Sequence, residues 1–116
     1  MKIPDVNNAV VPRAKLTNYL LSLTHEAGRS KARFFLRRGF SVETWDDLAS
    51  ALKHHAAQHD VARIEETPFG MRYVVEGHME MPDGRTAYIR SVWFVDLEGG
   101  PTRFVTAYPI EENDRD

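Results

Sequence analysis

The chain has 116 residues, of which 42% are hydrophobic and 28% charged, and its formal net charge is −2. This length and composition predict a single globular domain with one core over residues 1–110. The sequence contains no cysteine, which excludes disulfides and thiolate metal sites and favours a cytoplasmic location. No apolar run approaches the ~20 residues that cross a bilayer. The N-terminus also lacks the apolar region of a secretory signal, so we expect no membrane partner.

Apolar residues at helical spacing predict a first helix that begins at Pro12; these residues are Leu16, Tyr19, Leu20 and Leu23. The chain then breaks at Gly28. Ser30 is the expected N-cap of a second helix, and Gly39 suits its C-terminal end.

A third helix is predicted to start at Thr44, because Asp47 follows three residues later as in a capping box. It should end between Gln58 and Asp60. From Val61 onward the hydrophobic pattern has a period of two, which predicts strands over 61–69, 71–81, 85–97 and 102–108. About three helices followed by a four-stranded antiparallel meander make an α+β domain. The acidic residues 111–116 predict a flexible tail.

The turn signals also predict which residues face one another across the sheet. A two-residue turn in the PDG stretch places Gly77 opposite Arg90. The last hairpin places Tyr108 opposite Arg90, with Thr106 two residues away on the same face. That face is mostly apolar, so we expect it to meet the helices.

Arg90, Thr106 and Tyr108 form the first candidate site. A guanidinium flanked by two hydroxyls suits a phosphate or carboxylate, because arginine offers a planar fork of donors. The alternative is an arginine at the edge of the core, tied to backbone carbonyls, with Tyr108 capping the sheet. The other face offers Glu76 and His78 as a possible acid/base pair, but adjacent polar residues are also typical of an exposed sheet face.

The N-terminal third supplies a second candidate. Residues 13–38 hold seven basic side chains and one acidic one, so this stretch carries +6 and the rest of the chain −8. Such asymmetry predicts an anion-binding face; a solvated helix surface is the alternative. Arg29, Ser30 and Lys31 beside the N–H groups of a helix start would suit phosphate, and His25 could move a proton. Otherwise His25 is a loop residue that caps the preceding helix.

His55 and His59 lie one helical turn apart, a spacing that can chelate a metal ion. No third ligand accompanies them. The sequence therefore favours a surface histidine cluster at this position, and we expect no metal and no cofactor.

Three stretches together resemble a family of small bacterial proteins known as a domain of unknown function: VVPRAKLTNYLLSLTHEAGRSKARFF, PDGR and RSVWFVDLEGGPTRFVTAYP. That family is similar to the barnase–RelE class of ribonuclease toxins, which have N-terminal helices followed by a four-stranded antiparallel sheet. Members of that class cleave RNA without metal, often with a helix-borne His or Lys and a late-strand Thr and Tyr. The positions of this chain that match are His25, Lys31, Arg90, Thr106 and Tyr108.

The resemblance implies a metal-independent endoribonuclease, the toxin of a toxin–antitoxin or phage-defence pair. In this hypothesis Lys31 and Arg90 bind phosphate and His25 acts as acid or base. Thr106 and Tyr108 would orient the substrate or donate to it.

Substrate contacts are expected from Arg29, Ser30, Trp93 and Arg103. Trp93 could stack on a base, and a tryptophan buried in the core is the alternative. The expected partners are RNA and a small cognate antitoxin or immunity protein. The alternative is a non-catalytic module of the same fold, such as an immunity protein, an antitoxin or an adaptor, that binds a protein through the basic face.

Overall fold

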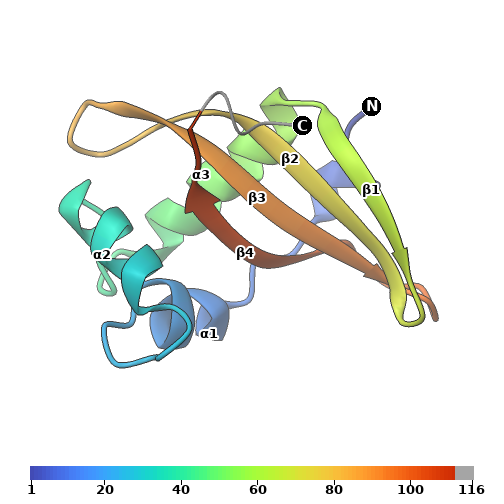
Figure 1. Cartoon of the computed structure of the whole chain (residues 1–116), viewed down its shortest axis with the longest axis horizontal. Coiled ribbons are helices and arrows are strands. Elements are labelled where there is room, and N and C mark those ends of the chain that lie inside the picture. Colours follow the sequence, from blue (N-terminus) through green and yellow to red (C-terminus); the bar gives the residue numbers. More distant parts are fainter. Residues whose placement is uncertain (112–116) are drawn as a thin grey trace.

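A computed structural model describes residues 1–111 (Figure 1). The elements follow the predicted order, helices first and strands after: η1 (Val6–Asn8), α1 (Arg13–Lys15), η2 (Leu16–Leu20), α2 (Arg29–Arg37), α3 (Trp45–Gln58), β1 (Val61–Thr67), β2 (Gly70–Glu80), β3 (Thr86–Asp96) and β4 (Arg103–Pro109). The predicted α+β class is confirmed. Apart from Glu111, the predicted tail lies outside the described residues.

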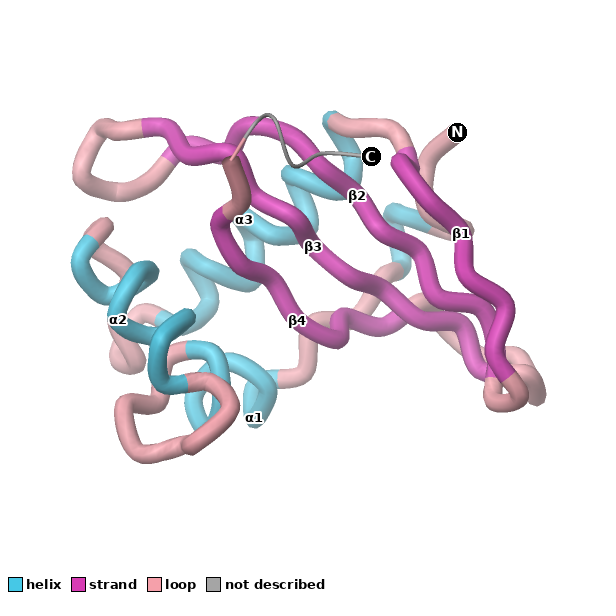
Figure 2. Tube along the Cα trace, in the orientation of Figure 1, coloured by secondary structure: helices cyan, strands magenta, loops and turns pink. Residues whose placement is uncertain are grey.

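The four strands form one antiparallel sheet in the order β1-β2-β3-β4, which confirms the meander (Figure 2). Helix α3 passes behind the sheet in Figure 1 and packs on one face, here called the inner face. Helices α1 and α2 lie beside β4. The opposite face is called the outer face. In the part of the chain described, no helix covers it.

The core lies between the inner face and the helices. Its largest fully buried side chains include Leu16, Leu20, Phe35, Leu48, Leu52, Ile89, Trp93 and Phe104. Burial of such side chains from both layers is the main force that holds α3 against the strands. Among residues 1–111, no helix has the length and apolar character that a bilayer crossing needs.

The turn between β2 and β3 is longer than predicted. The last paired residues are Glu80 and Thr86, so the connection spans five residues instead of two. The N–H of Met81 donates to the carbonyl of Arg85 at 2.8 Å. The turn is also tied to the end of α2, because the N–H of Asp83 donates to the carbonyl of Arg38 at 3.0 Å.

The longer turn shifts the register by one residue, so that Glu76, and not Gly77, lies opposite Arg90. A one-residue shift moves a side chain to the other face of the sheet. The predicted facing was therefore wrong: Arg90, Thr106 and Tyr108 lie on the outer face, away from α3. The prediction that Tyr108 pairs with Arg90 is confirmed.

The C-terminal end of α2 follows the prediction, and the N-terminal end does not. Gly39 ends the helix with a φ of +104°, a left-handed conformation that glycine adopts without strain. At the other end Gly28 occupies the N-cap position and the helix starts at Arg29. Ser30 is thus an exposed residue of the first turn, and the prediction of a Ser30 cap was wrong.

Helix α3 begins after Thr44 and ends at Gln58, as predicted. The capping box does not form, because Thr44 makes no side-chain cap bond. Its hydroxyl instead lies 2.7 Å from the hydroxyl of Ser41.

Candidate functional site

Six polar side chains gather on the outer face, where β3 and β4 approach α2 and the segment before it. We call them the Lys31 cluster: Tyr19, His25, Lys31, Arg90, Thr106 and Tyr108. Five of the six are the catalytic residues that the sequence predicted, and Tyr19 is the addition.

Tyr19 is the hydrogen-bonded centre of this cluster. The Lys31 Nζ donates to the Tyr19 Oη at 2.7 Å. The same Oη lies 2.9 Å from the Thr106 Oγ1. Lys31 also stands over the ring of Tyr108, with its Nζ 5.6 Å from the ring centroid. One ammonium group therefore contacts two tyrosines that are far apart in the sequence.

The surroundings of Tyr19 lower its pKa below the ordinary 10.0. Burial by itself would raise the pKa, because it disfavours the charged phenolate. The hydrogen bonds from Lys31 and Thr106 and the positive charges of Lys31 and Lys15 outweigh that effect. The phenol is thus easier to deprotonate than an ordinary tyrosine.

Arg90 is held by two partners. Its Nε and Nη2 both lie 2.6 Å from the Glu76 Oε2, and its Cζ lies 5.8 Å from the Tyr108 ring centroid. Side-chain hydrogen bonds with Tyr108 and then Glu76 raise the pKa of Arg90. The Glu76 side chain is only 3% exposed and that of Arg90 16%, so the guanidinium is fixed in position and orientation.

His25 is fixed at the border of the cluster. Its Nδ1 accepts hydrogen bonds from the N–H groups of Ala27 and Gly28, both at 3.2 Å. Its ring packs edge-on against the Tyr19 ring, with the two ring centroids 5.0 Å apart. Because Nδ1 accepts from two backbone donors, the neutral ring carries its proton on Nε2 and can donate from there.

The approach of the α2 start to Tyr19 depends on a glycine. A Cβ added to Gly28 would lie 2.4 Å from the Tyr19 carbonyl oxygen and 2.9 Å from its ring. Both distances are shorter than any real contact, and the first is to backbone, which cannot rotate away.

We therefore expect Gly28→Ala to push α2 away from Tyr19 and to lower the free energy of unfolding by about 1–3 kcal/mol. Urea denaturation measures this effect. Ser30→Ala, at an exposed position of the same turn, is the control and should change little. Equal stability of the two variants would contradict the close approach.

Trp93 cannot stack on a base, and that prediction was wrong. The residue is fully buried, and its indole N–H donates to the Ser91 Oγ at 2.9 Å. Its ring packs edge-on against Phe104 inside the core. The register shift explains the error, because it turns Trp93 to the inner face.

The other predicted substrate contacts lie outside the cluster. Arg103 is bound to Asp96 through two hydrogen bonds of 3.1 Å and stands over the Phe94 ring, towards the other end of β4. Arg29 and Ser30 are exposed on the first turn of α2.

Two residues of the site were not assigned to it from the sequence. Tyr19 has the same helical spacing as the core residues Leu16 and Leu20, so its pattern indicates burial. Glu76 was placed one position away from Arg90 by the predicted turn. Had the longer turn been recognised, Glu76 and Arg90 would have formed an evident cross-strand ion pair.

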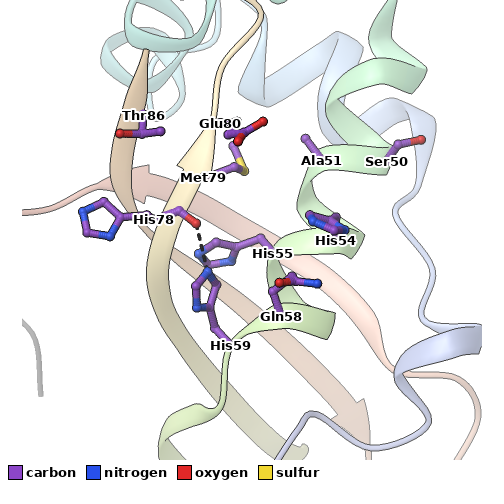
Figure 3. A pocket seen from close by; sticks show the side chains of 10 residues that line it. All are labelled: Ser50, Ala51, His54, His55, Gln58, His59, His78, Met79, Glu80 and Thr86. Atoms are coloured by element: carbon purple, nitrogen blue, oxygen red, sulfur yellow. Dashed lines mark hydrogen bonds between the residues drawn. The ribbon is translucent and has the colours of Figure 1, made fainter. Parts of the chain in front are cut away.

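A separate pocket of about 700 Å³ lies between α3 and the ends of β2 and β3 (Figure 3). Its walls include the polar side chains of Ser50, His54, Gln58, His59, Glu80 and Thr86. The lining residues include the carboxylate of Glu80 but no lysine or arginine, so the pocket offers no permanent cation to an anion. The Lys31 cluster, with two cations, is the better candidate for phosphate chemistry.

The histidines of α3 differ from the predicted surface cluster. His55 is 1% exposed, with both ring nitrogens bonded, to Ser91 and to the carbonyl of Gly77. Figure 3 shows His59 bonded to the backbone carbonyl of His78, at 2.9 Å. Within residues 1–111, no three metal-binding side chains gather around a common point.

Fold and site together define an α+β domain with a cationic, tyrosine-rich cluster on the open face of a four-stranded meander. The chain belongs to the family described as "Domain of unknown function (DUF6883)", whose model matches residues 2–111. The predicted resemblance to such a family is therefore confirmed.

The fold is also similar to a chain of a solved assembly, the "Contact-dependent growth inhibition toxin - immunity protein complex from Klebsiella pneumoniae 342". The TM-score is 0.68 at 19% sequence identity, and the match covers 87% of this chain and 99% of that chain. At this identity the similarity concerns the fold. No curated protein matches the sequence.

Proposed function

We propose that this protein is a metal-independent endoribonuclease that uses the Lys31 cluster, and that it acts as the toxin of a toxin–antitoxin or toxin–immunity pair. The observation that carries the proposal is the hydrogen bond between Lys31 and Tyr19. It joins a phenol of lowered pKa to a cation, beside the second cation of Arg90. These are the groups that cleavage of a ribose phosphate needs.

In the proposed reaction the ribose 2′-oxygen attacks the adjacent phosphorus and the bond to the 5′-oxygen breaks. The products are a 2′,3′-cyclic phosphate and a 5′-hydroxyl. Tyr19 takes the proton of the 2′-hydroxyl, and Tyr108 gives a proton to the 5′-oxygen. Arg90 and Lys31 stabilise the negative charge that develops on the phosphoryl oxygens.

The remaining groups of the cluster orient the reactants. Thr106 fixes the Tyr19 hydroxyl, and His25 donates to a phosphate oxygen from its Nε2. His25 is a weaker candidate for the general base, because a proton could reach Nδ1 only by displacing two backbone hydrogen bonds.

The role as a toxin is supported by the fold similarity to a chain of a toxin–immunity complex. The same similarity also favours the second candidate, a non-catalytic immunity protein or adaptor, because such a complex contains both kinds of protein. The two candidates differ in one testable respect. Only a toxin would arrest growth and cleave RNA by itself.

The test is to express the protein in bacteria and to incubate the purified protein with total RNA in the presence of a chelator. We expect growth arrest and RNA fragments that end in a 2′,3′-cyclic phosphate. Lys31→Met and Tyr108→Phe should each lower the cleavage rate by about 100-fold.

Matched controls are Lys53→Met, at an exposed position of α3, and Tyr73→Phe on β2. Both should cleave RNA at the wild-type rate. A wild type that leaves RNA intact and growth unaffected would exclude the nuclease and favour the binding module.

A further inference from the structure

Helix α2 carries a row of three arginines that the proposed reaction does not use. Arg29, Arg33 and Arg37 are all exposed. At four-residue intervals they fall within about 80° around the helix axis and about 12 Å along it. We call this row the arginine stripe.

Within residues 1–111, none of the three arginines of the stripe forms an ion pair. The helix itself contains no Asp or Glu. The ion pairs formed among residues 1–111 involve other cations: the N-terminus, Lys2, Arg63, Arg72, Arg85, Arg90 and Arg103. Three adjacent guanidinium groups that are not held in ion pairs make a surface that favours a polyanion.

The helix that carries the stripe is firmly anchored. Its buried side packs Ala32 and Phe35 into the core. Its C-terminal end holds the β2–β3 turn through the Arg38 carbonyl, and the Arg38 guanidinium stands over the Phe34 ring at 4.9 Å. The stripe is therefore displayed on a rigid support.

We infer that the arginine stripe binds the phosphate backbone of single-stranded RNA and leads it to the Lys31 cluster. This inference rests on the proposed function for the identity of the polyanion. Lys31 belongs to the same helix and lies about 200° around the axis from Arg29. A strand that crosses the exposed side of α2 would thus meet the stripe first and Lys31 next, with no acidic side chain of α2 on its path.

An acidic protein is the other polyanion that could bind the arginine stripe. The composition of the helix surface disfavours this ligand. Protein interfaces have a core of buried apolar and aromatic anchors. The large hydrophobic residues that are exposed among residues 1–111 are Met1, Val10, Leu23, Val42, Ile64, Phe69 and Leu97, and none of them belongs to α2. Phosphate contacts by arginine need no such apolar core.

The test measures binding of a fluorescent 2′-O-methyl RNA about 12 nucleotides long, in which the attacking hydroxyl is blocked. The probe is titrated at several salt concentrations with the wild type and with the variant Arg29→Gln/Arg33→Gln/Arg37→Gln. We expect the variant to bind about 10-fold more weakly. The slope of log affinity against log salt concentration should be shallower by about 2 for the variant, since each of the three lost phosphate contacts contributes about 0.7 to the slope.

The control is a triple variant with the same loss of charge away from α2, Lys2→Gln/Lys53→Gln/Arg63→Gln. It should keep both the affinity and the salt slope of the wild type, and both triple variants should show the wild-type circular dichroism. Equal binding of the probe by the two triple variants would overturn the inference. The alternative ligand of the stripe would then be an acidic protein. If the wild type binds the probe through the stripe but cleaves no RNA, the nuclease proposal fails and the binding surface stands.

Discussion

Tyr19→Phe removes one oxygen atom and is expected to slow RNA cleavage by about 100-fold or more, the usual loss when a general base is removed. The phenylalanine ring can still pack against His25, so the fold should persist. What disappears is the hydroxyl that accepts from Lys31 and contacts Thr106. Single-turnover cleavage of a defined oligonucleotide measures the loss.

The pH dependence distinguishes a base from a residue that only holds Lys31 in place. A base acts when deprotonated, so the wild-type rate should rise with pH up to the pKa of Tyr19. Lys31 contributes to the lowering of that pKa. Lys31→Met should therefore move the rising limb to higher pH as well as reducing the rate.

Two results would contradict these roles of Tyr19 and Lys31. If Tyr19→Phe cleaves within about twofold of the wild type, Tyr19 is no base and the proposed reaction needs another proton acceptor. If Lys31→Met lowers the rate without moving the pH profile, Lys31 acts on the phosphate alone.

Local patterns were sufficient to predict most of the fold. The apolar spacing of α3 and the alternation of the strands placed their bounds within a few residues, because both features depend on neighbours along the chain. The pairing of Arg90 with Tyr108 was also predicted, since it depends only on the last hairpin.

The errors have a common cause in contacts between distant residues. The β2–β3 turn takes five residues while Asp83 is bonded to the end of α2, a partner that the turn sequence does not reveal. The one-residue shift in register turned β3 and the end of β4 over relative to β2, whose Val75 and Gly77 face the helices. Trp93 was thereby misplaced as a base-stacking residue, and the ion pair between Glu76 and Arg90 was missed.

The site shows the same limit. His25 and Lys31 were predicted from the basic segment before and at the start of α2, Arg90 and Tyr108 from the strand register, and all four also from a family resemblance. The side chain that links them, Tyr19, has the spacing of a core residue. Its role depends on the close approach at Gly28, which is a property of the folded chain.

The largest expected effect on stability concerns His55, far from the Lys31 cluster. Its Nε2–H donates to the Gly77 carbonyl at 3.0 Å, and its Nδ1 lies 3.0 Å from the Ser91 Oγ. Because the proton of the neutral ring is on Nε2, Nδ1 is an acceptor and the Ser91 hydroxyl donates to it, while the oxygen of that hydroxyl accepts from Trp93. A proton on Nδ1 would break the bond from Ser91, so this buried network favours the neutral ring.

Burial is the main reason that the pKa of His55 falls from 6.5 to about 4. In the unfolded chain the ring regains its ordinary pKa, so between pH 6.5 and pH 4 the unfolded state binds one more proton than the folded state. Stability contributed by the neutral ring is complete above pH 6.5 and is lost as the pH falls through this window. The loss is about 1.4 kcal/mol per pH unit, or about 3 kcal/mol in total.

Urea denaturation at a series of pH values from 7.5 to about 4 measures this loss. His55→Gln has no titrating ring at this position, so its stability should fall less steeply with acid, although it starts lower. His54→Gln, one residue away and exposed, serves as the matched control and should retain the wild-type slope. Apart from residues 54 and 55, the three proteins have the same titratable groups, and the difference in slope between the two variants therefore isolates His55. A slope that is the same in His55→Gln and the wild type would mean that the ring accepts its proton within the folded core.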